Sequence, residues 1–184
     1  MRAISAFMTG ITRLNDVIGR CFSFLVIFMF LFLLMEVGFR YVLGSPLAWT
    51  SEMTQYLFGI YSIMAGGYLL AHNGHVNVDL FYNKFSVRGR AFIDLFTSII
   101  FFIFILALLY FAYDMAQESI GMWQTSNSSW NPPIWPVKLF MPIAAFLVLL
   151  QGIVKLLQDI AIAFNLSYYQ PPAEDEPHHT EADA

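Results

Sequence analysis

The sequence places one carboxylate, Glu36, inside a long apolar run, and Arg40 follows it four residues later. On a helix this spacing brings the two side chains onto one face, in the order that favours an ion pair. A charge at this depth of a bilayer is costly and is expected to face protein. Glu36 is therefore either a proton or substrate site, or one half of a pair that anchors the outer end of a helix or docks a partner. We favour the second interpretation.

A second polar cluster, His72, His75 and Asp79, follows the next apolar run. These residue types bind metals, but no fourth ligand lies nearby and the spacing fits no standard zinc site. Gly74 instead indicates a helix C-terminus, where the negative end of the helix dipole favours His72. We predict a structural corner here, with Asp79 in the first turn of a short following helix, and we predict no metal and no cofactor.

Trp49 and Glu52 open the second apolar run. Glu52 is either a first-turn acid favoured by the helix dipole, with Thr50 or Ser51 as the cap, or a polar contact to a second subunit. The residues alone leave these two alternatives open.

Small residues recur along the same run, at Gly59, Ser62 and Gly66. Ser62 and Gly66 form a small-xxx-small pair, which lets two helix backbones approach closely in lipid. We therefore predict tight packing of this helix, although the pattern does not identify the helix it packs against.

The composition requires lipid as the solvent for much of the surface. Of the 184 residues, 58% are apolar and 12% are charged, and the mean hydropathy is +0.62, whereas about a quarter of the residues in a soluble domain are charged. A bilayer core of about 30 Å takes roughly 20 apolar residues of helix, and only helices satisfy their own backbone in lipid. We predict an all-α membrane protein with four transmembrane helices, at 17–43, 49–72, 91–117 and 135–158.

The segments outside the spans are predicted from their own patterns. Apolar residues at helical spacing indicate a short amphipathic helix lying flat in the inner interface, at about 76–86. Residues 1–16 form a cytoplasmic N-terminal segment, and the acidic, proline-containing segment 161–184 is expected to be disordered. The single cysteine, Cys21, is interpreted as a small apolar residue.

Basic residues orient the spans. Seven of the nine lysines and arginines lie on the side that carries both termini, and only Arg40 and Lys138 lie on the other. The positive-inside rule therefore puts both termini in the cytoplasm. All four tryptophans, including Trp49 and Trp135, lie in or beside the outward segments, which indicates an ordinary interfacial belt or an outer face that packs against protein. The outer loop 121–136 contains prolines and asparagines, and we expect it to be irregular but stiff.

Several motifs together resemble one family of transport proteins. These motifs are the runs Trp49-x-x-Glu52, Gly66-Gly67 and Gly74-His75-Val76-x-Val78-Asp79. They resemble the small (DctQ-type) membrane subunit of tripartite ATP-independent periplasmic (TRAP) transporters. The branch labelled mannitol/chloroaromatic or 2-oxo-acid type is resembled by Leu80-Phe81-Tyr82 and Arg88-Gly89-Arg90-Ala91, and Trp135-Pro136-x-Lys138 and Leu150-Gln151-Gly152 also fit. The resemblance covers about residues 10–160.

The resemblance implies a non-catalytic scaffold in a bacterial inner membrane. Such subunits associate with a large polytopic membrane subunit that holds the substrate and sodium sites, and a periplasmic binding protein delivers an organic acid. The small subunit enlarges and steadies the immobile part of that assembly. The candidate interface residues are Glu36, Arg40, Trp49, Glu52, Gly59, Ser62, Gly66, His75, Asp79, Trp135 and Lys138.

Two other functions compete with this one. The first is a self-contained, proton-coupled exporter with Glu36 as its coupling acid, and the second is a membrane anchor for a redox enzyme. The sequence contains no nucleotide-binding loop, no H-E-x-x-H motif and no mid-membrane histidine pair for haem, and it shows no basic face for nucleic acid. A bare exporter would also need fewer loop and tail residues. We therefore predict a membrane protein that is not an enzyme.

Overall fold

The chain folds into helices in the part that the computed structural model describes, which comprises residues 2–45, 47–72 and 87–164. The one β interaction within these ranges is an isolated bridge between Thr125 and Pro133 in a loop. This confirms the predicted all-α class for the described residues. The helices are α1 (Arg2–Ser23), α2 (Leu25–Val42), α3 (Ala48–Ala71), α5 (Val87–Gly121) and α6 (Trp135–Ala163).

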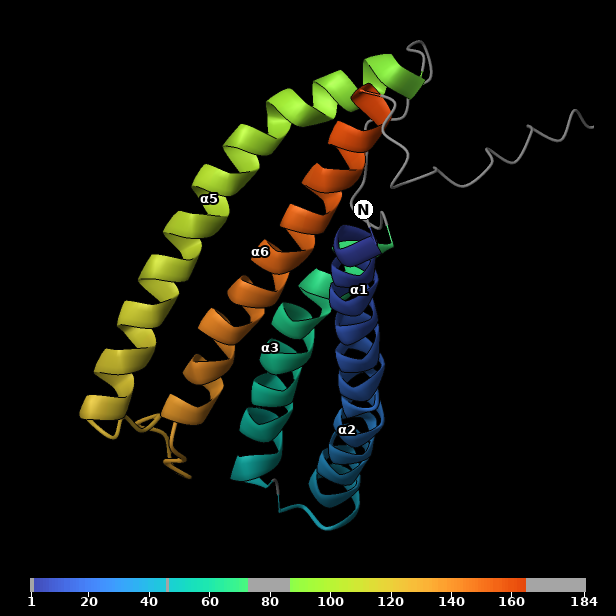
Figure 1. The fold of residues 1–184 in the computed structure, drawn as a ribbon. Coiled ribbons are helices and arrows are strands. Elements are labelled where there is room, and N and C mark those ends of the chain that lie inside the picture. Colours follow the sequence, from blue (N-terminus) through green and yellow to red (C-terminus); the bar gives the residue numbers. More distant parts are fainter. Residues whose placement is uncertain (1, 46, 73–86, 165–184) are drawn as a thin grey trace, which may run out of the picture.

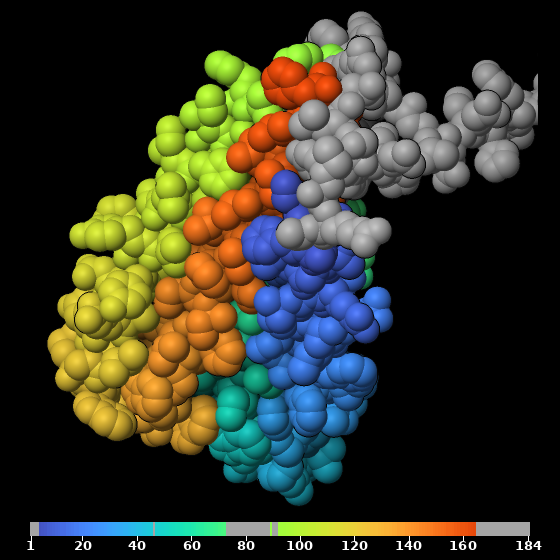
Figure 2. Space-filling view, in the orientation of Figure 1, coloured from blue at the N-terminus to red at the C-terminus, as the bar shows by residue number. Residues whose placement is uncertain are grey.

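The helices lie in a row, in the order α5, α6, α3 and then α1 with α2 (Figure 1). α5 packs mainly against α6, α6 against α3, and α3 against α1 and α2, while α1 also reaches α6. In the space-filling view α6 forms a strip with α5 on one side and α1 on the other (Figure 2). We call the end that carries the first residue of α1 the inner end, and the opposite end, which carries the α5–α6 loop, the outer end.

α1 and α2 form one nearly continuous helix. The stretch Ile4–Val42 has 39 residues, which at 1.5 Å per residue is about 58 Å, close to twice the thickness of a bilayer core. An irregular turn separates α1 from α2 after Ser23. The Ser23 hydroxyl donates to the carbonyl of Arg20 at 2.7 Å. Residues 1–16 are predicted only as a cytoplasmic N-terminal segment. In the structure the helix begins at Arg2, and α1 packs against α3 and α6.

Three helical stretches within the described residues are long and apolar enough to cross a membrane by length and composition: Ile4–Val42, Phe92–Gly121 and Trp135–Ala163. They correspond to the first, third and fourth predicted spans. α3 corresponds to the second, but its glycine, serine, threonine and tyrosine residues make it less apolar than the others. Because α3 packs against α1, α2 and α6, much of its surface faces protein and need not be as apolar as a lipid-facing surface.

The helix bounds differ from the predicted spans by a few residues. α5 extends beyond the predicted span 91–117 at both ends, and α6 continues through Ala163 into the segment predicted as tail. Ala161 and Ala163 are buried, so packing carries the helix past the predicted end. The predicted flat helix at 76–86 and the tail from residue 165 lie outside the described residues.

A small apolar core joins three helices. Met64 of α3 packs with Ala144 and Leu147 of α6, and Phe22 of α1 covers them. The rings of Phe22 and Phe140 meet edge to face, with their centroids 5.8 Å apart. This core fixes α1, α3 and α6 relative to one another.

The loop between α5 and α6 is irregular, as predicted. The Ser126 amide donates to the carbonyl of Pro132 at 3.0 Å, and the Asn127 amide donates to the side-chain oxygen of Asn131 at 3.0 Å. Asn127 and Asn131 have φ angles of 55° and 51°, a region that asparagine enters more readily than most residues. Hydrogen bonds across the loop therefore hold its two sides together.

Candidate functional site

The Glu36 carboxylate joins α2 to α3 at the outer end. Its Oε1 accepts a hydrogen bond and forms an ion pair with Arg40 of the same helix. Its Oε2 accepts hydrogen bonds from the hydroxyls of Thr50 at 3.0 Å and Ser51 at 2.7 Å. Glu36 and Thr50 are buried, whereas more than half of the Arg40 side chain is exposed. Because both oxygens of the carboxylate have donors, the geometry is that of an anchor between two helices.

One of the two alternatives left open for the start of α3, a capped helix with Glu52 in its first turn, is wrong. Thr50 and Ser51 do not cap the helix, because it begins two residues before Thr50 and their hydroxyls turn to Glu36 instead. For the same reason Glu52 does not lie in the first turn. Its carboxylate accepts a long hydrogen bond, 3.4 Å, from the hydroxyl of Ser126 in the outer loop. The acceptor for the hydroxyls of Thr50 and Ser51 is therefore Glu36 of the preceding helix, α2.

Aromatic pairs connect the outer loop to the helices. The Trp49 ring lies 6.2 Å from that of Trp130 in the loop and 5.7 Å from that of Phe32 in α2, measured between centroids. Trp135 at the start of α6 meets Trp123 edge to face at 5.7 Å. The four tryptophans therefore gather at the outer end, where they fix the loop against α2, α3 and α6.

Lys138 also connects α6 to this loop. Its Nζ donates to the side-chain oxygen of Gln124 at 2.7 Å, and the same oxygen accepts from the hydroxyl of Ser119 at 3.0 Å. Ser119 lies near the end of α5 and is 1% exposed. Lys138 thus uses its charge within the chain to join the ends of α5 and α6.

A buried polar group, which we call the polar seam, holds α1, α3 and α6 together. Asn15 is 2% exposed and donates to the side-chain oxygen of Gln151 at 3.0 Å, and Gln151 donates to the Thr12 hydroxyl at 3.4 Å. α3 passes beside this pair because Gly67 has no side chain: a Cβ there would lie 2.1 Å from Oδ1 of Asn15. The polar seam therefore consists of Thr12, Asn15, Gly67 and Gln151.

α1 and α3 also approach closely where the last turns of the two helices meet. A Cβ at Gly19 would lie 2.6 Å from the Cβ of Tyr68, so only glycine fits there without a shift. His72 follows the last residue of α3, in agreement with the predicted helix end. Its Nε2 lies 3.6 Å from Oδ1 of Asp16, and its ring stacks at a tilt on Tyr68, with the centroids 4.3 Å apart.

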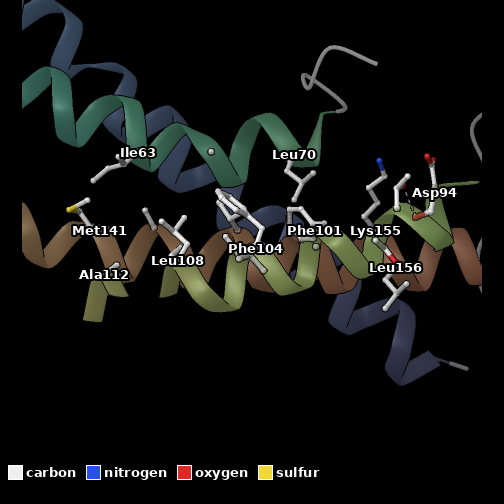
Figure 3. A pocket seen from close by; sticks show the side chains of 18 of the residues that line it. Ile63, Leu70, Asp94, Phe101, Phe104, Leu108, Ala112, Met141, Lys155 and Leu156 are labelled. Carbon is white, nitrogen blue, oxygen red and sulfur yellow. Dashed lines mark hydrogen bonds between the residues drawn. The ribbon is translucent and has the colours of Figure 1, made fainter. Parts of the chain in front are cut away.

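An open groove of about 610 Å³ runs between α3 and α5, with α6 as its floor (Figure 3). We call it the α3–α5 groove. Met141 lies toward its outer end, and Asp94 and Lys155 lie together at its inner end (Figure 3). Asp159 lines it as well. The groove is thus apolar along most of its length and charged at one end.

The predicted small-residue face of α3 borders this groove. Ser62 and Gly66 both line it, and Ser62 is exposed. A Cβ at Gly66 would lie 3.1 Å from a methyl group of Val148 in α6, whereas one at Gly59 would meet nothing within 4 Å. The face thus contacts α6 at Gly66 and is open toward Gly59.

His75 and Asp79 lie outside the described residues, so the corner that they were expected to form stays a prediction. Among the residues that are described, no group of three or more histidine, cysteine, aspartate or glutamate side chains could hold a metal ion.

Sequence reasoning missed the polar seam and the charged end of the groove. Gln151 and Asp159 did carry a signal, because polar side chains inside an apolar helix usually face protein. Asn15 and Gly67 carried none, since each is ordinary within its own helix and acquires its role only where the two helices meet.

Comparison with family models identifies a family for most of the chain. Residues 10–162 match the family described as tripartite ATP-independent periplasmic transporters, DctQ component. A comparison with curated proteins gives no match. The matched range covers most of the chain and contains the Glu36 cluster, the polar seam and the α3–α5 groove. The chain therefore belongs to the DctQ-component family of TRAP transporters.

Proposed function

We propose that this chain is the small membrane subunit that braces the large membrane subunit of a TRAP transporter in the bacterial inner membrane. The family is a component of a tripartite transport system, and its partners in this proposal are a large polytopic subunit and a periplasmic binding protein. The large subunit moves an organic acid together with sodium, and the binding protein delivers that acid. The small subunit performs no reaction and steadies the part of the assembly that does not move.

The Glu36 cluster is the observation that carries this proposal. A coupling acid has to exchange a proton or a substrate during each cycle, so its carboxylate must become accessible. Glu36 is instead buried and bound by donors from two helices, Arg40 on α2 and Thr50 and Ser51 on α3. This arrangement supports an anchor rather than the coupling acid of a self-contained exporter.

Replacing Glu36 with glutamine tests the two functions. Glutamine keeps an acceptor for the hydroxyls but loses the charge, so we expect at most a loss of about 1–2 kcal/mol in stability. Uptake of the organic acid, normalised to the amount of assembled transporter, should stay unchanged in cells that express all three components. The matched control is Glu52→Gln, which removes another carboxylate from the same end of the protein.

Two outcomes of this experiment would contradict the proposal. One is normal abundance of the Glu36→Gln transporter with abolished uptake, which would assign Glu36 to the transport cycle. The other is movement of a solute across vesicles that contain this chain alone.

We further propose that α3 is the second of four spans and that both ends of the chain are cytoplasmic. α3 has 24 residues, about 36 Å of helix and enough to cross a bilayer core. It runs alongside its neighbours in the row (Figure 1). The distribution of basic residues supports the orientation, because in the sequence seven of the nine lie before or at the start of the first predicted span, between the second and third, or near the end of the fourth.

Labelling of single cysteines checks this topology. In a Cys21→Ser background, Ser45→Cys and Ser129→Cys should both react with a membrane-impermeant maleimide added to spheroplasts. Thr9→Cys, which is also exposed, should react only after permeabilisation. Ser45 precedes α3 and Ser129 follows α5, so labelling of these two positions from opposite sides would show that α3 does not cross.

The transported solute is proposed from the branch resemblance alone. The motifs noted above resemble the mannitol/chloroaromatic or 2-oxo-acid branch, so we propose an organic acid of the 2-oxo-acid type. Thermal-shift measurements on the cognate binding protein, with a panel of 2-oxo acids and of acids that lack the oxo group, test this choice.

A further inference from the structure

The α3–α5 groove has the length of a transmembrane element. Its floor on α6 runs from Met141 to Asp159, which is about 27 Å along the helix axis and nearly the full thickness of a bilayer core. A lipid acyl chain from one leaflet covers only about half of that thickness. The groove therefore fits an occupant that spans both leaflets better than it fits a single lipid.

The groove also permits a close approach of another backbone. Ser62 and Gly66 form part of the α3 wall, and Ala144, Ala145 and Gly152 lie along the floor. Small residues at a helix interface allow the van der Waals contact and interhelical hydrogen bonding that drive association in lipid. On α3 this face is open, because Ser62 is exposed and Gly59 has no neighbour at its Cβ position.

Asp159 gives the occupant a chemical identity. Asp159 is 8% exposed, and no hydrogen bond or ion pair within 4 Å joins its carboxylate to the described residues. Lys155, one turn away on α6, attracts the carboxylate, and Asp94 on α5 repels it. Asp94 and Lys155 line the same end of the groove. A largely buried acid that is not closely paired is costly, and a cationic side chain that approached it would lower that cost.

We propose that the α3–α5 groove receives one transmembrane helix of the large membrane subunit, and that a lysine or arginine at the inner end of that helix pairs with Asp159. The inference rests on the proposed function, because it assumes that the large subunit is the partner. It adds the face that binds, the kind of element bound and the charge that fixes its register.

Photo-crosslinking locates the occupant. A benzophenone amino acid is placed at Ser62, inside the groove, or at Ile103, which lies on α5 outside the groove lining and is 66% exposed. In membranes of cells that express the whole transporter, Ser62 should give a covalent product with the large subunit, and Ile103 should give at least about tenfold less.

Each result of this experiment has a defined meaning. A product between Ser62 and lipid alone would overturn the proposal in favour of a lipid-filled groove. Crosslinking to the large subunit from Ile103 that equals or exceeds that from Ser62 would rule out the groove as the binding face but keep the proposed function. Absence of any large-subunit product from every position, together with failure to co-purify, would sink the proposed function as well.

A charge exchange tests the role of Asp159. Asp159→Lys should lower co-purification of the large subunit by at least about tenfold, because it places a like charge against the partner's cation. Asp159→Asn should give a smaller loss, and it guards against a folding defect of the lysine variant. Asp114→Lys, an exposed acid near the outer end of α5, is the control and should change nothing.

Restoration of the complex would identify the partner's cation. Changing one inner-end lysine or arginine of the large subunit to aspartate should recover co-purification with Asp159→Lys. Undiminished co-purification of both Asp159 variants would overturn the assigned pairing.

Discussion

Replacing Gly19 with alanine should loosen α1 from α3 and lower the free energy of unfolding by about 2 kcal/mol or more. The new Cβ would lie 2.6 Å from the Cβ of Tyr68. That atom is attached directly to the backbone, so no rotation of the Tyr68 side chain can move it away. The helices themselves must separate, and thermal unfolding of the protein in lipid nanodiscs would report the loss.

Gly10→Ala is the matched control, because it makes the same chemical change in the same helix. A Cβ at Gly10 meets nothing within 4 Å, so the substitution should stabilise α1 by about 0.5–1 kcal/mol through its helix propensity. Equal melting temperatures for the Gly19 and Gly10 variants would show that the close approach of α1 and α3 does not exist.

The second large effect is expected at the polar seam. Gly67→Ala would place a Cβ 2.1 Å from Oδ1 of Asn15, so the Asn15 side chain must leave Gln151. Both amides are buried, and an unsatisfied buried polar group costs about 1–3 kcal/mol. We expect Gly67→Ala to lower stability by that amount, in the same nanodisc measurement.

A double-mutant cycle separates this mechanism from a general packing defect. Asn15→Ala removes the side chain that the new methyl group strikes, so Gly67→Ala should cost much less in an Asn15→Ala background. The coupling should lie between about 0.5 and 3 kcal/mol. Strictly additive effects would mean that Gly67 and Asn15 do not meet. Gly59→Ala, in the same helix but facing open space, controls for helix propensity.

The sequence allowed the apolar helical stretches to be predicted, because a bilayer admits little else along an uncharged apolar run. The part of α1 before residue 17 was not predicted as helix, although its apolar residues recur at helical spacing. Likewise, the hydroxyls of Thr50 and Ser51 suggested capping, and the competing acceptor, Glu36, became visible only when α2 and α3 were placed side by side.

The order of the helices and the α3–α5 groove could not be predicted for a different reason. In lipid, a surface that packs on protein and one that faces acyl chains are equally apolar, so hydropathy does not distinguish them. Ser62 and Gly66 indicated a packing face, and only the structure shows that Gly66 contacts α6 while the exposed Ser62 borders a groove.

The row of helices has a consequence for biogenesis. α5 packs mainly on α6, and α2 mainly on α3. In the proposed four-span topology, each of these pairs is a helical hairpin that can enter the membrane as one unit. The packing of the two hairpins against each other depends on the surfaces where α6 contacts α3 and α1. A substitution that disrupts these surfaces would leave both hairpins inserted but not packed together. We therefore expect degradation by membrane proteases rather than failure of membrane insertion.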